Sequence, residues 1–261
     1  MKIYTKTTLI AELKKITARG WIKNRRHGNH GGVGNTLEDL LGIEENNLPI
    51  PNAAEWELKT HRIGSASLIT LLHTEPSPRA IRFVPAVLLP KYGWKHKEAG
   101  KKYPRAEKSF RQTISGLSSS DRGFIVKVNR REKKVMISFD VSKVDSRHSS
   151  WLKRVKKLID VGELDPQPYW GFDDLKHAAG AKLLNSFFVQ AEVKRERGGE
   201  QYRYTKIMML RGFDFEGLLK AIETGDLYVD FDARTGHNHG TKFRMREAKL
   251  PELYKEVKII L

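Results

Sequence analysis

The chain has 261 residues, 39% of them hydrophobic and 30% charged, which provides enough apolar sequence for a folded core and excludes a disordered protein. The absence of cysteine excludes disulfide bonds, thiolate zinc sites and a cysteine nucleophile. The 48 lysine and arginine residues outnumber the 31 aspartate and glutamate residues, giving a formal net charge of +17. This charge predicts a polyanionic partner, with nucleic acid ahead of an anionic membrane surface or of general basicity.

Membrane insertion and export are not expected. No apolar run approaches the roughly 20 residues that span a bilayer. Lysines interrupt the apolar residues of the opening segment MKIYTKTTLIAELKK, which therefore lacks a signal-peptide core. We expect a cytoplasmic protein.

The first elements in chain order are expected to be two helices. Residues 8–18 repeat apolar positions at helical spacing, and Gly20 ends that pattern. A glycine-rich stretch follows, in which Asn35 or Thr36 could cap a short helix that carries Glu38.

Two strands and a basic segment are expected next. The strand at 56–60 should pair with a strand at 65–73. The segment from Lys91 to Arg111, both included, contains eight lysine or arginine residues and two acidic ones, interleaved with Tyr92, Trp94, Tyr103 and Phe110. We expect an arm against DNA in which Lys101 and Lys102 contact the backbone, and a solvated surface insertion is the alternative.

The remaining elements alternate strands and helices. Two prolines, Pro166 and Pro168, suggest a lobe boundary, with a catalytic lobe and its basic arm at 1–165 and a DNA-recognition lobe at 166–261, although the lobes could interleave. The patterns predict a hairpin at 123–141, helices at 149–159, 172–182 and 214–224, and strands at 186–194, 201–211 and 227–233.

Glu57 and Lys59 give the clearest indication of a catalytic site. They stand two apart on a predicted strand and so project from the same face. A carboxylate there can hold Mg²⁺, and the lysine can orient water and offset charge on an attacked phosphate. This is the E-x-K half of the PD-(D/E)xK nuclease motif. It is supported by the position five before Glu57, which fits the first half of the motif, and by Glu38, which can supply another carboxylate.

A second candidate site lies in the glycine-containing segment 234–244. Its arginines could contact guanine O6 and N7, and its histidines could read other base edges. The candidates are Arg234, His237, His239 and Arg244. A transition-metal site at the two histidines lacks a third ligand nearby, and a purely structural hairpin remains the other interpretation.

Two weaker patterns complete the set. Arg25 and Arg26 precede a glycine turn that could bring backbone amides near a phosphate, so they are candidates for contact with the DNA backbone. Glu192 and Lys194 repeat an E-x-K pattern, but no suitable first half precedes them. We interpret that pair as a structural face.

Taken together, these segments resemble the MvaI/BcnI restriction endonuclease family over nearly the whole chain. The similarity is strongest in WIKNRRHGNHGGVGNTLEDLL (21–41), NNLPIPNAAEWELKTH (46–61), PYWGFDDL (168–175) and GHNHGTKFR (236–244). It implies an α/β fold with a PD-(D/E)xK restriction-endonuclease-like core, a mixed sheet, and two lobes that form a DNA-binding cleft, as in MutH. It also implies that Glu57 binds the metal, Lys59 is the catalytic lysine and Glu38 is a supporting carboxylate.

Position 52 departs from the family pattern. Where the family has an aspartate ligand, this sequence has Asn52, whose neutral amide offers one carbonyl oxygen and should weaken Mg²⁺ binding. Asn52 is either an engineered, inactivating change, which we favour, or a natural variant that uses other carboxylates such as Glu55.

The resemblance therefore predicts a type II restriction endonuclease. It would hydrolyse double-stranded DNA with Mg²⁺ at a short, nearly palindromic site, act as a monomer and have a cognate DNA methyltransferase. Two alternatives stay open: a MutH-like mismatch-repair nicking enzyme, and a DNA-binding module that has lost catalysis.

Overall fold

The computed structural model describes residues 4–24, 32–43, 56–66, 68–159, 163–197 and 199–261, and it divides into two compact units. The first unit comprises Met1–Leu68, Ala178–Gly217 and Arg246–Leu261, and the second comprises Ile69–His177 and Leu218–Met245. The chain therefore passes between the units several times. No helix among the described residues is both long enough and apolar enough to cross a bilayer.

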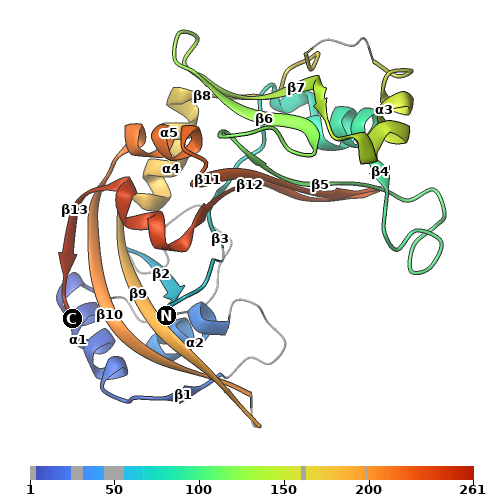
Figure 1. Ribbon diagram of the computed structural model, residues 1–261. Helices are drawn as coiled ribbons and strands as arrows, with labels where there is room; N and C mark the ends of the chain where they lie inside the picture. The colour runs from blue at the N-terminus through green and yellow to red at the C-terminus, as the bar shows by residue number, and fades with distance from the viewer. Residues whose placement is uncertain (1–3, 25–31, 44–55, 67, 160–162, 198) are drawn as a thin grey trace. The chain divides into compact units, whose positions relative to one another are not determined.

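The first unit is built on a mixed five-stranded sheet (Figure 1). β2 runs parallel to β9, whereas the other pairings, β9 with β10 and β10 with β1 and β13, are antiparallel. The strands are β1 (Ile22–Lys23), β2 (Glu57–Arg62), β9 (Asn185–Glu196), β10 (Gly199–Phe213) and β13 (Tyr254–Ile259). The mixed α/β architecture expected from the sequence is confirmed.

Two helices, α1 (Lys6–Thr17) and α2 (Gly32–Leu41), cover one face of this sheet. Alternation along each strand places one set of side chains in the core beneath the helices and the other set on the opposite face. The shared core includes Leu9, Leu13, Val33, Leu37, Leu58, Phe187, Val189, Tyr202 and Tyr204. Because Leu58 faces this core, its neighbours Glu57 and Lys59 belong to the opposite face.

The prediction that Asn35 or Thr36 caps the second helix is wrong. The helix begins at Gly32, so both residues lie within it, and Thr36 is fully buried. The buried positions Val33, Leu37 and Leu41 repeat every four residues, which extends the helix toward its N-terminus.

The second unit contains two sheets. One has the order β3-β12-β11-β5-β4, and the other has the order β6-β7-β8. Their bounds are β3 (Leu68–His73), β4 (Trp94–Lys95), β5 (Lys108–Ser115), β6 (Arg122–Asn129), β7 (Lys134–Val144), β8 (Tyr169–Gly171), β11 (Leu227–Arg234) and β12 (His237–Arg246). Phe110 of β5 packs edge-on against Phe124 of β6 and Phe231 of β11, so an aromatic core joins the two sheets.

Helices and short turns complete the structure. The helices α4 (Phe172–Leu183) and α5 (Phe215–Glu223) carry the chain between the units. The others are α3 (Ser149–Val155), the π-helical segment η2 (Val84–Tyr92), and the 3₁₀ turns η1 (Arg79–Ile81), η3 (Ser146–His148) and η4 (Glu247–Leu253).

The expected pairing of the strands at 56–60 and 65–73 is also wrong. β2 pairs with β9, far along the chain, whereas β3 lies beside β12 in the other sheet. Strands that are neighbours in sequence usually form a hairpin. Here β2 pairs within the first unit and β3 pairs within the second unit. Most of the other predicted elements are confirmed to within a few residues: the hairpin at 123–141, the helices at 8–18, 172–182 and 214–224, and the strands at 186–194, 201–211 and 227–233. The helix predicted at 149–159 ends earlier, at Val155.

Candidate active site and nucleic-acid interface

The side chains of Glu57 and Lys59 meet on the sheet face opposite the helices. Lys59 Nζ lies 2.7 Å from Glu57 Oε1, and the Glu57 side chain is only 4% exposed. β2 holds both residues in the register that pairs Glu57 with Ser186 of β9. A buried carboxylate is costly unless a cation compensates it, and Lys59 provides that compensation.

A second cation approaches the same carboxylate. Lys182 Nζ, from the last turn of α4, lies 4.0 Å from Glu57 Oε1. Sequence analysis missed Lys182, because one lysine at the end of a helix far along the chain gives no signal of its own. Glu57 is therefore a carboxylate flanked by two ammonium groups, an arrangement suited to an anionic phosphate nearby.

Tyr254 of β13 borders this carboxylate. Burial, with a further contribution from the negative charge of Glu57, raises the pKa of the Tyr254 hydroxyl well above its usual range. The hydroxyl is also 2.6 Å from the Ser186 hydroxyl. Tyr254 therefore stays neutral at physiological pH.

A buried histidine and carboxylate secure the end of β2. His61 Nδ1 lies 2.8 Å from Glu247 Oε2, and the backbone N–H of Arg62 donates to that same oxygen at 3.3 Å. The His61 ring also stacks on Phe188 at a centroid distance of 5.8 Å. His61 shares the face of Glu57 and Lys59, so this cluster, which sequence analysis also missed, fixes the strand that carries them.

Glu38 lies on α2 and is half-buried. Its charge, with that of Asp39, contributes to raising the pKa of Tyr204, although burial of the phenol is the larger cause. Asn52, Glu55, Arg25 and Arg26 lie outside the described residues. Among the residues described, no group of three or more histidine, aspartate or glutamate side chains is arranged to hold a metal ion.

Arg234 lies at the end of β11 and contacts the basic segment. Its Nη1 is 3.2 Å from Oε1 of the buried Glu107, and its guanidinium lies over the Tyr103 ring at 4.7 Å from the centroid. Three backbone N–H groups, of Lys101, Lys102 and Tyr103, also donate to the carbonyl of Glu98. The predicted arm is thus a folded loop held to β11, in which Lys101 and Lys102 are exposed.

The two histidines lie at the exposed start of β12. The rings of His237 and His239 meet edge to face at a centroid distance of 4.2 Å. Glu75, which the sequence did not single out, braces this turn by accepting from the Thr241 backbone N–H at 2.9 Å and from its hydroxyl at 3.1 Å. Both imidazoles therefore lie on the solvent-exposed end of the β11–β12 hairpin, which the hydrogen bonds to Glu75 hold in place.

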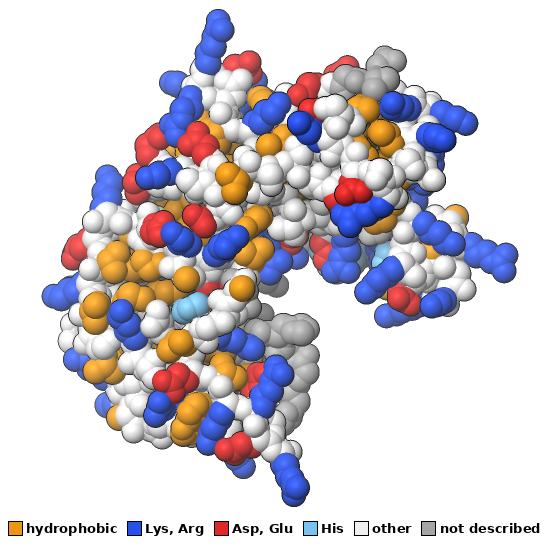
Figure 2. All heavy atoms as spheres, viewed as in Figure 1, with side chains coloured by type: hydrophobic (Ala, Val, Ile, Leu, Met, Phe, Trp, Pro, Cys, Tyr) orange, Lys and Arg blue, Asp and Glu red, His pale blue; other side chains and the backbone are white. Residues whose placement is uncertain are grey.

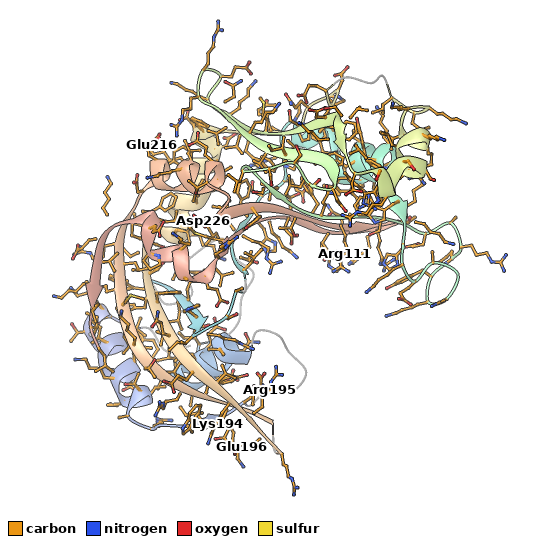
Figure 3. The ribbon with its side chains drawn as sticks, viewed as in Figure 1. Arg111, Lys194, Arg195, Glu196, Glu216 and Asp226 are labelled. Carbon is orange, nitrogen blue, oxygen red and sulfur yellow. The ribbon has the colours of Figure 1, made fainter. Side chains whose placement is uncertain are left out.

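Arg244 lies further along β12 and forms an ion pair at 3.4 Å with Asp230 of β11. The second E-x-K pair also has surface partners: Glu192 pairs with Arg203, and Lys194 pairs with Glu196. Figure 3 labels Lys194, Arg195 and Glu196 at the end of β9. Glu192 and Lys194 therefore form ordinary ion pairs on an exposed part of the strand.

The contacts of Arg234 predict that Arg234→Ala loosens the basic loop. Without the guanidinium, the buried Glu107 loses its ion pair with Arg234, which should lower the free energy of unfolding by about 1–3 kcal/mol. The substitution also uncovers the ring of Tyr103. We expect faster cleavage by trypsin after Lys101 or Lys102, detected by mass spectrometry. Arg130→Ala, which breaks an exposed ion pair with Glu223, is the matched control. Equal cleavage rates in both variants would show that Arg234 does not hold the loop.

Comparison with known proteins agrees with these features. The sequence profile of the MvaI/BcnI restriction endonuclease family matches residues 10–254. A solved complex described as restriction endonuclease MvaI with cognate DNA substrate is 27% identical, covers 99% of this chain and all of its own, and has a TM-score of 0.76. MvaI in the absence of DNA is also 27% identical, covers both chains fully and has a TM-score of 0.57. No curated protein sequence matches significantly. This chain belongs to the MvaI/BcnI restriction endonuclease family.

Proposed function

We propose that this protein is a type II restriction endonuclease that uses Mg²⁺ to hydrolyse double-stranded DNA at a short, nearly palindromic site. The observation that carries the proposal is the buried Glu57–Lys59 pair on β2, in a chain of a restriction endonuclease family. The first unit holds this pair and would carry catalysis. The second unit holds Arg234, His237, His239 and Arg244, and would carry recognition.

The donor chemistry of Glu57 fits a hard divalent cation. Lys59 and Lys182 both approach Glu57 at Oε1. A carboxylate has two oxygens and can bind a metal ion beside such cations. The family resemblance assigns residue 52 as a further ligand and Glu38 as a supporting carboxylate. Mg²⁺, when bound, would lower the pKa of a water molecule and polarise the phosphate.

The lysines would act directly on the substrate. The Lys59 side chain is 16% exposed and that of Lys182 is 28% exposed, so both side chains reach solvent while their ammonium groups stay close to the carboxylate. A phosphate placed at this face would meet two positive charges, which stabilise the negative charge that develops during hydrolysis. Glu57 would hold the metal, and its negative charge would offset the repulsion between the two ammonium groups.

The remaining properties follow from the family resemblance. We propose that the protein acts as a monomer, with a cognate DNA methyltransferase that protects the same site. The chain's charge supports contact with DNA, and Figure 2 shows lysine and arginine side chains over much of the viewed face.

Asn52→Asp tests the catalytic assignment. An aspartate would add a second anionic ligand to the proposed metal site, so we expect Mg²⁺-dependent cleavage of plasmid DNA to rise by at least ten-fold. Sequencing of the ends should show one short repeated site. Lys59→Ala in the same background should remove the gain, because the charge at the phosphate is lost.

The outcomes separate the candidate functions. If neither the original chain nor Asn52→Asp cuts DNA while both bind it, a DNA-binding module or a MutH-like enzyme that needs partner proteins becomes the better account. Robust cutting by the isolated protein excludes that requirement for partners.

Lys101 and Lys102 provide a test of the basic loop. If both contact phosphates, replacing them with alanine should weaken binding to all DNA sequences and reduce the slope of log affinity against log salt by about 0.9 for each contact. Lys15→Ala, on the exposed side of α1, is the control for loss of a lysine. An unchanged salt slope would mean that the loop faces solvent in the complex.

A further inference from the structure

Two buried hydroxyl groups, those of Ser186 and Tyr254, border the candidate active site. Ser186 lies at the start of β9 and is fully buried, and Tyr254 begins β13 and is 7% exposed. β10 pairs with both of these strands and so lies between them. The Tyr254 side chain reaches across β10, because its hydroxyl oxygen lies 2.6 Å from that of Ser186.

The Ser186 hydroxyl shares the sheet face of Glu57. The parallel register makes Ser186 the partner of Glu57, and neighbouring strands lie roughly 4.8 Å apart. Phe187 packs into the core beneath the helices, so alternation places Ser186 on the opposite face, where the Glu57–Lys59 pair lies. Burial raises the pKa of Tyr254, and the negative charge of Glu57 raises it further, which agrees with this placement.

One short connection brings both Lys182 and Ser186 to this face. α4 ends at Leu183 and β9 begins at Asn185, so the two residues are close in sequence. Lys182 Nζ lies 4.0 Å from Glu57 Oε1. The end of α4 and the start of β9 thus supply an ammonium group and a hydroxyl group to the surroundings of one carboxylate.

The hydroxyl pair keeps hydrogen-bonding capacity beyond its own contact. Each hydroxyl has one proton to donate and two lone pairs to accept with. One hydrogen bond between Ser186 and Tyr254 uses a single proton, and the raised pKa of Tyr254 means that its own proton is retained at physiological pH. Buried polar groups are normally satisfied by partners, so the remaining capacity points to another polar group at this face.

Stability alone gives little reason for this pair. A hydrogen bond within a protein contributes little net stability, because folding exchanges it for hydrogen bonds to water. Replacing both partners by apolar groups of the same shape, as phenylalanine and alanine would do here, can be nearly neutral. A ligand at this face would give the two hydroxyls a purpose that stability does not.

A hydrated divalent cation is a ligand that fits these hydroxyls. Mg²⁺ usually binds one or two protein carboxylates and keeps several water molecules. Such a water molecule donates hydrogen bonds, and a serine oxygen can accept one while it also accepts from tyrosine. Protein groups that hydrogen-bond to the ligands of a metal orient those ligands and raise the affinity for the metal.

We propose that Ser186 and Tyr254 are positioning residues of the metal site: Tyr254 holds the Ser186 hydroxyl, which hydrogen-bonds to a water molecule of the cation bound by Glu57. Neither residue touches the metal itself. The inference rests on the proposed function, because it requires a divalent cation at Glu57.

Titration with Mn²⁺ in the absence of DNA tests the proposal without relying on cleavage. The free ion is followed by electron paramagnetic resonance, with all substitutions made in the Asn52→Asp chain. Tyr254→Phe and Ser186→Ala should each weaken Mn²⁺ binding by about 10- to 100-fold. Tyr204→Phe is the matched control, because it removes a buried hydroxyl that donates to the Val33 carbonyl under the helices, and it should leave the affinity unchanged.

The double variant tests whether the two hydroxyls act in series. If Tyr254 acts through Ser186, Tyr254→Phe combined with Ser186→Ala should weaken Mn²⁺ binding by about the same factor as Ser186→Ala alone. Losses that multiply would show that each hydroxyl acts separately and would overturn the positioning of Ser186 by Tyr254.

A crystal structure with Mn²⁺ examines the unaltered hydroxyl pair, and it decides the matter if a variant loses its thermal unfolding transition. A water molecule on the metal should lie within about 3 Å of Ser186 Oγ. A metal on Glu57 whose water molecules leave Ser186 bonded only to Tyr254 would overturn the inference.

The results separate this inference from the proposed function. No Mn²⁺ binding, or binding that Glu57→Gln leaves unchanged, would overturn the proposed metal site. Binding that requires Glu57 but withstands both Tyr254→Phe and Ser186→Ala would leave the metal site intact and overturn the role of the two hydroxyls.

Discussion

The buried carboxylate of Glu57 is the constraint on which the candidate active site depends. It is nearly inaccessible on β2, and its charge is compensated by Lys59 at 2.7 Å and Lys182 at 4.0 Å. Burial strengthens these interactions, and the loss of either lysine leaves the carboxylate less compensated. β2, the strand that carries Glu57, is held in place by its parallel pairing with β9 and by the His61–Glu247 contact. These contacts of the first unit therefore fix the position of Glu57.

The second unit places its charged groups on a sheet whose other face is an aromatic core. Phe110, Phe231 and Phe243 are buried, which makes the strands β5, β11 and β12 a rigid support for the polar side chains between them. Arg234 differs from these side chains because it forms an ion pair with Glu107 and lies over the ring of Tyr103. Arg234 therefore holds the basic loop against β11.

Local pattern predicted much of this structure and part of the site. Helical spacing identified α1, α4 and α5, and the two-residue spacing of Glu57 and Lys59 placed both on one face. Pairing between distant strands could not be predicted, because a single sequence contains no signal that joins β2 to β9. Lys182 and Glu247 were missed for the same reason: each reaches the face of β2 only through tertiary contacts.

The most direct test of the central claim is to locate a bound divalent cation. Crystals of the Asn52→Asp variant soaked in Mn²⁺, measured by anomalous diffraction, should show a metal bonded to a carboxylate oxygen of Glu57. Mn²⁺ accepts oxygen ligands similar to those of Mg²⁺ and can be located by its anomalous signal. A metal bound elsewhere, with Glu57 still engaged only by Lys59 and Lys182, would contradict the assignment of this face as the active site.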